Sequence, residues 1–131
     1  MMPARPNSLS RILIVDDDVV LRTMLGLMLS GEGYDIGQAG NSEQAIALFR
    51  RRPFDLVITE LNLEGKDGFQ MIAELKREPF RAAFIALIRL GWMPADFCRR
   101  MADDLGAHSV LTKPFPSEQL LAAVRSALGE N

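Results

Sequence analysis

The sequence contains little of what enzyme active sites and disulfide-bonded domains are usually built from. Among its 131 residues there is one cysteine, Cys98, and one histidine, His108. A single cysteine excludes an internal disulfide. Ser/His/Asp or Cys/His catalysis would have to use one of these two residues, and neither has an evident partner in the sequence. We therefore expect Cys98 to be a packing or surface thiol and His108 to lie on the surface rather than bind a metal.

The chain also has no excess of charge of one sign. Its 15 Lys and Arg residues and 17 Asp and Glu residues give a net charge of −2, and the one basic run is residues 50–52. That run suits the carboxyl end of a helix, where cations interact favourably with the helix dipole. The sequence therefore shows no electrostatic footprint for nucleic acid.

Long apolar stretches are absent too, and residues 1–10 contain no apolar segment of the kind found in signal peptides. We expect no membrane span, a disordered lead-in over residues 1–9 and a single domain over residues 10–129. With 48% apolar and 24% charged residues, the composition is that of an ordinary globular protein. Seven methionines and no cysteine pair agree with a reducing, cytoplasmic location.

Short apolar runs alternate along the chain with amphipathic segments. The runs at residues 12–15, 56–59 and 110–112 predict strands buried on both faces. Two further strands are predicted over residues 34–38, the weakest of the five, and 82–88. The segments between them predict helices, of which the first covers residues 19–30, the third ends near Pro79 and the fourth covers residues 94–105. This alternation is the βαβ signature of an α/β protein whose parallel sheet has helices on both faces.

Spacing and capping residues carry the helix predictions. In the first helix, the residues spaced as one helical face are Leu21, Met24, Leu25 and Met28. Asn41 or Ser42 is expected to cap the second helix. In the fifth helix, the residues expected to face inward are Leu121, Val124 and Leu128.

Charged residues directly follow three of the predicted strands. Asp16, Asp17 and Asp18 follow the first strand, Glu60 follows the third, and Lys113 follows the fifth. Because ligands collect beyond the carboxyl ends of the strands in open parallel sheets, we expect these side chains to converge. Such a site can hold a divalent cation and a phosphoryl group. Asp18 suits capping of the first helix better than ligand binding.

Three segments carry a resemblance to a known family. They are Ile-Leu-Ile-Val-Asp-Asp-Asp at 12–18, Asp-Leu-Val-Ile-Thr-Glu-Leu-Asn-Leu-Glu-Gly-Lys-Asp-Gly at 55–68 and Gly-Ala-His-Ser-Val-Leu-Thr-Lys-Pro-Phe at 106–115. Together they resemble the response-regulator receiver domain, the phospho-accepting module of two-component signalling. The resemblance implies a flavodoxin-like (βα)5 three-layer sandwich with five parallel strands in the order 2-1-3-4-5. It also implies a cis peptide bond between Lys113 and Pro114.

The resemblance further implies a role for each site residue. Asp17 would bind Mg²⁺ directly, Asp16 would act largely through water, and Asn62 would offer its backbone carbonyl. Lys113 would contact the phosphoryl oxygens. Where the family carries the aspartate that accepts the phosphoryl group, this chain has Glu60.

Glu60 changes what such a site could do. Its additional methylene moves the carboxylate outward by roughly one C–C bond, and misplacement near 1 Å can cost about a hundredfold in rate. We therefore expect poor attack on a phosphohistidine partner and Mg²⁺ binding that is weakened or lost. A glutamate here would instead present a permanent negative charge to Lys113, in imitation of the phosphorylated state.

Two other positions depart from the family pattern. After phosphorylation, family members draw in a hydroxyl residue at the end of the fourth strand and an aromatic residue on the fifth. This chain has Ile88 and Val110 there, which provide neither a hydrogen-bond donor nor a ring. Both could also be ordinary core residues at strand ends, and the two interpretations are compatible.

These residues together predict a pseudo-receiver, a signalling module and not an enzyme, that acts by phosphorylation-independent protein-protein interaction. Its partner would be a histidine kinase, a phosphotransfer protein or another regulator, and the chain would be a monomer or a weak homodimer. By the resemblance, the fourth helix contributes to the partner face, on which the candidate contact residues are Trp92, Phe97, Arg99 and Arg100. Half-buried packing is an equal alternative for the aromatic residues.

Two other functions stay open. The first is a competent receiver phosphorylated at another acidic residue such as Asp17. The second is a flavodoxin-like small enzyme or cofactor-binding protein, since one fold can host unrelated sites. No Gly-rich phosphate loop follows the first strand, and the acidic run there would repel an anionic cofactor. We therefore expect no organic cofactor.

Overall fold

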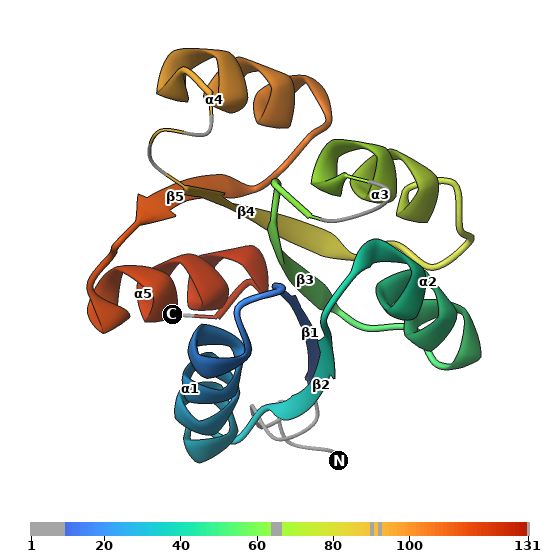
Figure 1. Cartoon of the computed structure of the whole chain (residues 1–131). Helices are drawn as coiled ribbons and strands as arrows, with labels where there is room; N and C mark the ends of the chain where they lie inside the picture. The colour runs from blue at the N-terminus through green and yellow to red at the C-terminus, as the bar shows by residue number, and fades with distance from the viewer. Residues whose placement is uncertain (1–9, 64–66, 90, 92, 131) are drawn as a thin grey trace.

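Five parallel strands form one sheet in the order β2-β1-β3-β4-β5 (Figure 1). The computed structural model describes residues 10–63, 67–89, 91 and 93–130, so the expected lead-in over residues 1–9 lies outside the described residues. The strands are β1 (Arg11–Val15), β2 (Asp35–Ala39), β3 (Leu56–Glu60), β4 (Ala83–Arg89) and β5 (Ser109–Lys113).

One helix follows each strand. The helices are α1 (Val19–Gly31), α2 (Ser42–Arg51), α3 (Gly68–Leu75), α4 (Ala95–Asp104) and α5 (Ser117–Ala127). Helices α1 and α5 lie side by side on one face of the sheet, and α2, α3 and α4 cover the other (Figure 1). The predicted three-layer α/β sandwich and its strand order are therefore confirmed.

Alternation along the strands divides the core into two halves. Ile12 and Ile14 pack toward α1 and α5, whereas Leu13 and Val15 pack toward α2, α3 and α4, and all four are fully buried. Side chains on a strand point alternately to the two faces of the sheet. With a helical layer on each face, both sets are removed from water, which explains why residues 12–15 of β1 read as a continuous apolar run.

The predicted caps are confirmed at the first two helices. The side chain of Asp18 accepts a hydrogen bond from the Leu21 backbone N–H, and that of Asn41 accepts one from Gln44. Each carboxylate or amide oxygen thereby satisfies a backbone donor that the first helical turn leaves unpaired.

The predicted end of α3 near Pro79 is wrong, because the helix stops at Leu75. Beyond it, the N–H groups of Arg77 and Glu78 donate to carbonyls three residues earlier instead of four. The chain therefore tightens into turns one turn before the proline.

Two helices are rotated relative to the faces expected from their spacing. In α1, Leu25 and Leu29 are buried while Met24 is 62% exposed. Gly26 lies so close to Gln38 of β2 that a Cβ atom there would come within 2.9 Å of its side-chain nitrogen, and this approach turns Met24 away from the sheet. In α5, Leu120 and Val124 are buried, whereas the expected Leu121 and Leu128 lie at the edge of the same core cluster. The two helices were predicted correctly, but the faces that they bury differ from those expected from the residue spacing.

A buried tyrosine joins the last described residues to the rest of the domain. Tyr34 is 4% exposed, and its hydroxyl donates a hydrogen bond to Oε1 of Glu130 at 2.7 Å. Burial, followed by the hydrogen bond and charge of Glu130, raises the pKa of Tyr34 to about 12. The C-terminal segment after α5 is therefore tied to the start of β2.

Since Tyr34 is the only tyrosine, absorbance at 295 nm should report its ionisation alone. We expect a midpoint near pH 12 in the folded chain. The unfolded chain loses this proton near pH 10, so the stabilisation is complete below about pH 10 and is lost as the pH rises to about 12. Two pKa units correspond to about 2.7 kcal/mol. Tyr34→Phe should lack both the absorbance change and this part of the alkaline stability loss, and a midpoint near 10 in the native chain would contradict the assignment.

Candidate functional site

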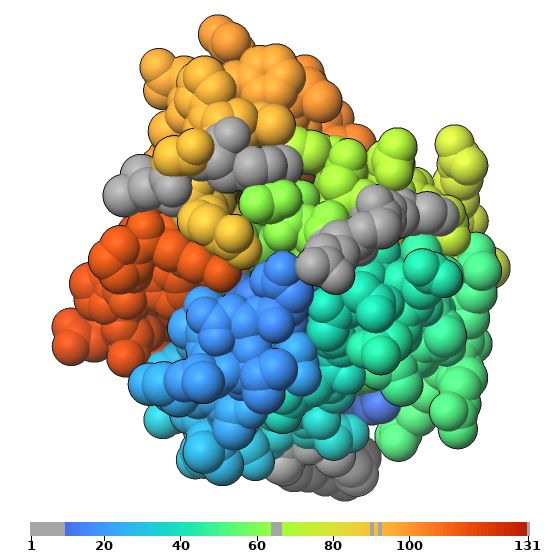
Figure 2. All heavy atoms as spheres, viewed as in Figure 1, coloured from blue at the N-terminus to red at the C-terminus, as the bar shows by residue number. Residues whose placement is uncertain are grey.

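Two buried carboxylates lie at the carboxyl-terminal edge of the sheet. Asp16 directly follows β1, Glu60 is the last residue of β3, and neither is exposed to solvent. Asp17, one residue further along, is exposed, with 35% of its side chain accessible. In the space-filling view, the blue residues around the start of α1 lie beside the gold end of β4 and the green segment after β3 (Figure 2). The convergence expected from the sequence is therefore observed.

Lys113 supplies the first cation to these carboxylates. From the end of β5, its Nζ lies 2.7 Å from Oδ2 of Asp16 and 3.5 Å from Oε2 of Glu60. The other oxygen of Asp16 accepts a hydrogen bond from the Asp18 backbone N–H at 2.9 Å. The peptide bond between Lys113 and Pro114 is cis, as expected. Lys113 is thus bonded primarily to Asp16 and more loosely to Glu60.

Arg89 supplies a second cation that the sequence reasoning missed. Its Nη2 lies 3.2 Å from Oε1 of Glu60 and 3.6 Å from Oδ1 of Asp17. Arg89 ends β4 and is the register neighbour of Lys113 on β5. The rule that identified Lys113, a charged residue directly after an apolar strand, applies equally to Arg89 and could have found it.

Glu60 has charged neighbours but no hydrogen bond among the described residues: both of its side-chain oxygens are buried and unsatisfied. Burial raises the pKa of Glu60 above its ordinary value; Lys113 and Arg89 oppose this, while the negative charge of Asp16 adds to it. A carboxylate in this position is stabilised by unlike charge at short range, because water cannot reach it.

The loop after β3 holds Glu60 against the start of α3. A Cβ atom at Gly68 would lie 2.6 Å from the Glu60 carbonyl oxygen and 2.6 Å from Cα of Leu61, so only glycine fits there. The Gly68 N–H donates to the Leu61 carbonyl at 2.9 Å. Asn62 lies in this loop and is half-buried.

The arrangement does not suit a divalent cation. In the part of the chain that the structure describes, no three Asp, Glu, His or Cys side chains are grouped as a metal site requires. The oxygens that would bind it already face protein cations: Asp16 faces Lys113, while Asp17 and Glu60 face Arg89. A metal ion would therefore compete with a protein cation at each of these side chains.

Ile88 and Val110, the two residues that depart from the expected switch pattern, meet in one core cluster. Ile88 is 1% exposed and belongs to the core half beneath α4, together with Cys98 and Ala102. Val110 is partly buried and packs against the same cluster. The two side chains fill space between β4, β5 and α4. Cys98 is therefore a packing thiol, and His108 is exposed, as expected.

The expected partner residues on α4 lie on the surface. Phe97 is 42% exposed, and Arg99 and Arg100 are exposed. Arg99 donates a hydrogen bond to Oγ1 of Thr112 at 3.1 Å, which links α4 to β5. Trp92, the fourth residue of this prediction, lies outside the described residues.

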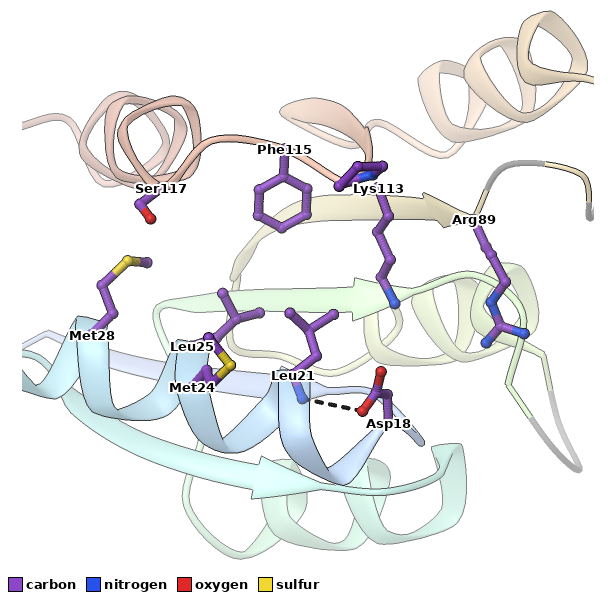
Figure 3. Close-up of a pocket in the computed structure, with 10 residues that line it drawn as sticks. Asp18, Leu21, Met24, Leu25, Met28, Arg89, Lys113, Phe115 and Ser117 are labelled. Carbon is purple, nitrogen blue, oxygen red and sulfur yellow. Dashed lines mark hydrogen bonds between the residues drawn. The ribbon is translucent and has the colours of Figure 1, made fainter.

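An apolar groove runs along α1 next to the charged site. It has a volume of about 710 Å³. Figure 3 shows methionine and leucine side chains of α1 facing Phe115 and Ser117 from the segment after β5, with Lys113 and Arg89 at one end. The residues that line it from α1 are Leu21, Met24, Leu25 and Met28. The spacing that predicted α1 therefore marks a face that lines this groove and also reaches the core, through Leu25. None of the helices in the described ranges is long and apolar enough to cross a membrane.

Solved structures share this architecture. A putative response regulator from Chloroflexus aurantiacus J-10-fl matches with a TM-score of 0.84 and 27% identity, covering 96% of this chain and 100% of that one. The chemotaxis response regulator CheY4 of Vibrio cholerae matches with a TM-score of 0.80 and 25% identity, covering 91% of this chain and 98% of that one.

Comparison of the sequence with those of known proteins also finds relatives among regulatory proteins. The transcriptional regulatory protein GlrR of Escherichia coli (strain K12) is 33% identical over 122 residues, which are 93% of this chain and 27% of that protein. The probable transcriptional regulator ycf27 of Porphyridium aerugineum is 32% identical over 118 residues, 90% of this chain and 48% of that protein. The chain thus spans between about a quarter and a half of these relatives. A family model of the response regulator receiver domain matches residues 12–125, and the chain therefore belongs to the receiver domain family of two-component response regulators.

Proposed function

We propose that this receiver domain is a pseudo-receiver, which takes part in two-component signalling through protein contacts and without regulated phosphorylation at Glu60. In this proposal residues 10–129 act as one cytoplasmic unit that is neither an enzyme nor a carrier of an organic cofactor. The observation that supports the proposal is the state of Glu60, the residue that we expect at the phosphoacceptor position: it is fully buried, with Arg89 and Lys113 near its two oxygens.

The buried carboxylate is poorly placed to act as a nucleophile. Attack on a phosphoryl group needs an oxygen free to approach the phosphorus in line with the leaving group. Oε1 of Glu60 faces Arg89, and Oε2 faces Lys113. Receiver domains typically bind Mg²⁺ at this acidic site, and here the same cations compete for its expected ligands Asp16 and Asp17. We therefore take Mg²⁺ binding to be weakened or lost.

The residues that would transmit a conformational change from this site to the surface around α4 also differ from the family pattern. Ile88 has no donor for a phosphoryl oxygen, and Val110 has no ring that could rotate. Both instead contribute apolar packing beneath α4. The fixed negative charge of Glu60 would then hold one conformation and not switch between two.

Protein contacts would be made by the surfaces around this site. The groove along α1 offers exposed apolar side chains beside the charged residues, as a docking surface for a helix would. Phe97, Arg99 and Arg100 on α4 offer a second surface. The partner would be a histidine kinase, a phosphotransfer protein or another regulator, with the chain itself a monomer or a weak homodimer. With a net charge of −2, nucleic acid is not proposed as a partner.

Phosphorylation tests the proposal directly. With acetyl phosphate and Mg²⁺, the native chain should show no added phosphoryl mass, and Glu60→Asp should gain some because its carboxylate is withdrawn toward the backbone. Glu60→Gln is the matched control and should stay unmodified. Stoichiometric, reversible phosphorylation of native Glu60 would refute the pseudo-receiver. A phosphoryl group found on Asp17 would favour the competent receiver instead, since Asp17 is the accessible acid of the site.

Lys113 should be essential to folding stability rather than to switching. Lys113→Met leaves Asp16 and Glu60 buried without their closest cation. Removal of one partner from a buried ion pair costs about 3–5 kcal/mol, which urea denaturation can measure. Lys76→Met, at an exposed lysine whose ammonium lies 5.7 Å from the centre of the Phe84 ring, should cost no more than about 1 kcal/mol. Equal stability of the Lys113→Met and native chains would mean that the ion pairs contribute nothing.

The two candidate docking surfaces can be separated by mutation. Met24→Glu places a charge in the groove at a 62% exposed position, so the fold should tolerate it. Binding of a histidine kinase or phosphotransfer protein from the same organism, measured by calorimetry, should weaken at least tenfold. Phe97→Glu is the comparison on α4. If only the α4 variant loses affinity, docking along α1 is wrong.

A further inference from the structure

We propose that Arg89 is the resident cation of this pocket: its guanidinium joins Glu60 to Asp17 in place of a divalent metal ion and keeps the site closed to such ions. The inference rests on the proposed function, because it explains how the pocket stays in one state without metal or phosphoryl group. The affinity of the pocket for divalent metal ions can be tested separately, without any measurement of phosphorylation.

Position on the sheet allows Arg89 to act in this way. Glu60 ends β3, Asp17 follows β1, and β4 lies next to β3. From the end of β4, the Arg89 side chain reaches both carboxylates, at 3.2 Å and 3.6 Å. Lys113, its register neighbour, is directed to Asp16. Figure 3 shows Arg89 and Lys113 extending from neighbouring strands. Asp17 thus faces Arg89, Asp16 faces Lys113, and Glu60 lies near both cations.

Charge balance then decides whether a metal ion can enter. The three carboxylates and two protein cations leave one formal negative charge. A divalent ion would add charge next to an arginine that it repels. Without Arg89 the same carboxylates would keep two formal negative charges, which one divalent ion neutralises. Hard cations such as Mg²⁺ bind to carboxylate oxygens, so loss of the guanidinium should create affinity.

Arg89 is also the member of the network that can be removed with least damage to the fold. Its side chain is 46% exposed, against 15% for Lys113. The Arg89 pair with Asp17 is partly exposed on both sides and contributes little to stability. The buried Glu60 keeps Lys113 as its other cation. Arg89→Gln should therefore fold and retain the Lys113 contacts, which makes the variant suitable for binding experiments.

The test consists of two metal titrations. Binding of Mn²⁺ is measured by the paramagnetic broadening of the amide signals of residues 16–18 and 60–61, and binding of Mg²⁺ is measured by calorimetry. Native protein should show no saturable site at low millimolar metal, and Arg89→Gln should bind at least tenfold more tightly. Arg125→Gln is the matched control: Arg125 is 40% exposed and lies in a single described ion pair, 2.9 Å from Glu32, on α5. Arg125→Gln changes the net charge by the same amount as Arg89→Gln, and it should bind metal ions with the affinity of the native chain.

Arg89→Lys separates charge from size, and should stay within about twofold of the native affinity because it keeps a cation. The proposal is overturned if native protein binds as tightly as Arg89→Gln, if Arg89→Gln gains no affinity while folded, or if Arg89→Lys gains as much as Arg89→Gln. These outcomes differ from failure of the proposed function, which would appear as phosphorylation of Glu60 whatever the metal affinity of the variants.

Discussion

Two carboxylates that water cannot reach impose the main constraint on this receiver domain. Asp16 and Glu60 are fully buried at one edge of the sheet, and a buried anion is tolerated only beside a cation or a set of donors. The strands provide the cations, because β4 and β5 end in Arg89 and Lys113 at adjacent register positions. Loss of Lys113 would leave negative charge in a region of low dielectric, whereas water can partly replace the half-exposed Arg89.

The same constraint limits the chemistry of the edge. In a phosphorylation-regulated site, a carboxylate oxygen must be free to receive and release a group, and a metal ion must be free to exchange. Here each acidic side chain already faces an arginine or a lysine. The pocket thus holds a network of ion pairs, of which Arg89 and Asp17 are partly exposed. Its contribution would then lie in the shape that it maintains for nearby surfaces, including the groove along α1.

Sequence was a good guide wherever the signal was local or periodic. Strand runs and the caps Asp18 and Asn41 were predicted because each depends on residues close together in the chain. The convergence of charges at the strand ends was predicted because parallel strands end at the same edge of a sheet. Packing decided the rest. The buried face of α1 depends on how closely Gly26 approaches β2. The partners of Arg89 depend on the pairing of β4 with β3, which spacing alone does not specify.

The glycine at the start of α3 has a mechanical consequence. Gly68 touches the backbone of Glu60 and Leu61 so closely that no side chain could be inserted between them. The end of β3 and the first turn of α3 are therefore in direct backbone contact. A displacement of the main chain at Glu60, whatever its origin, would press on the start of α3 through this contact.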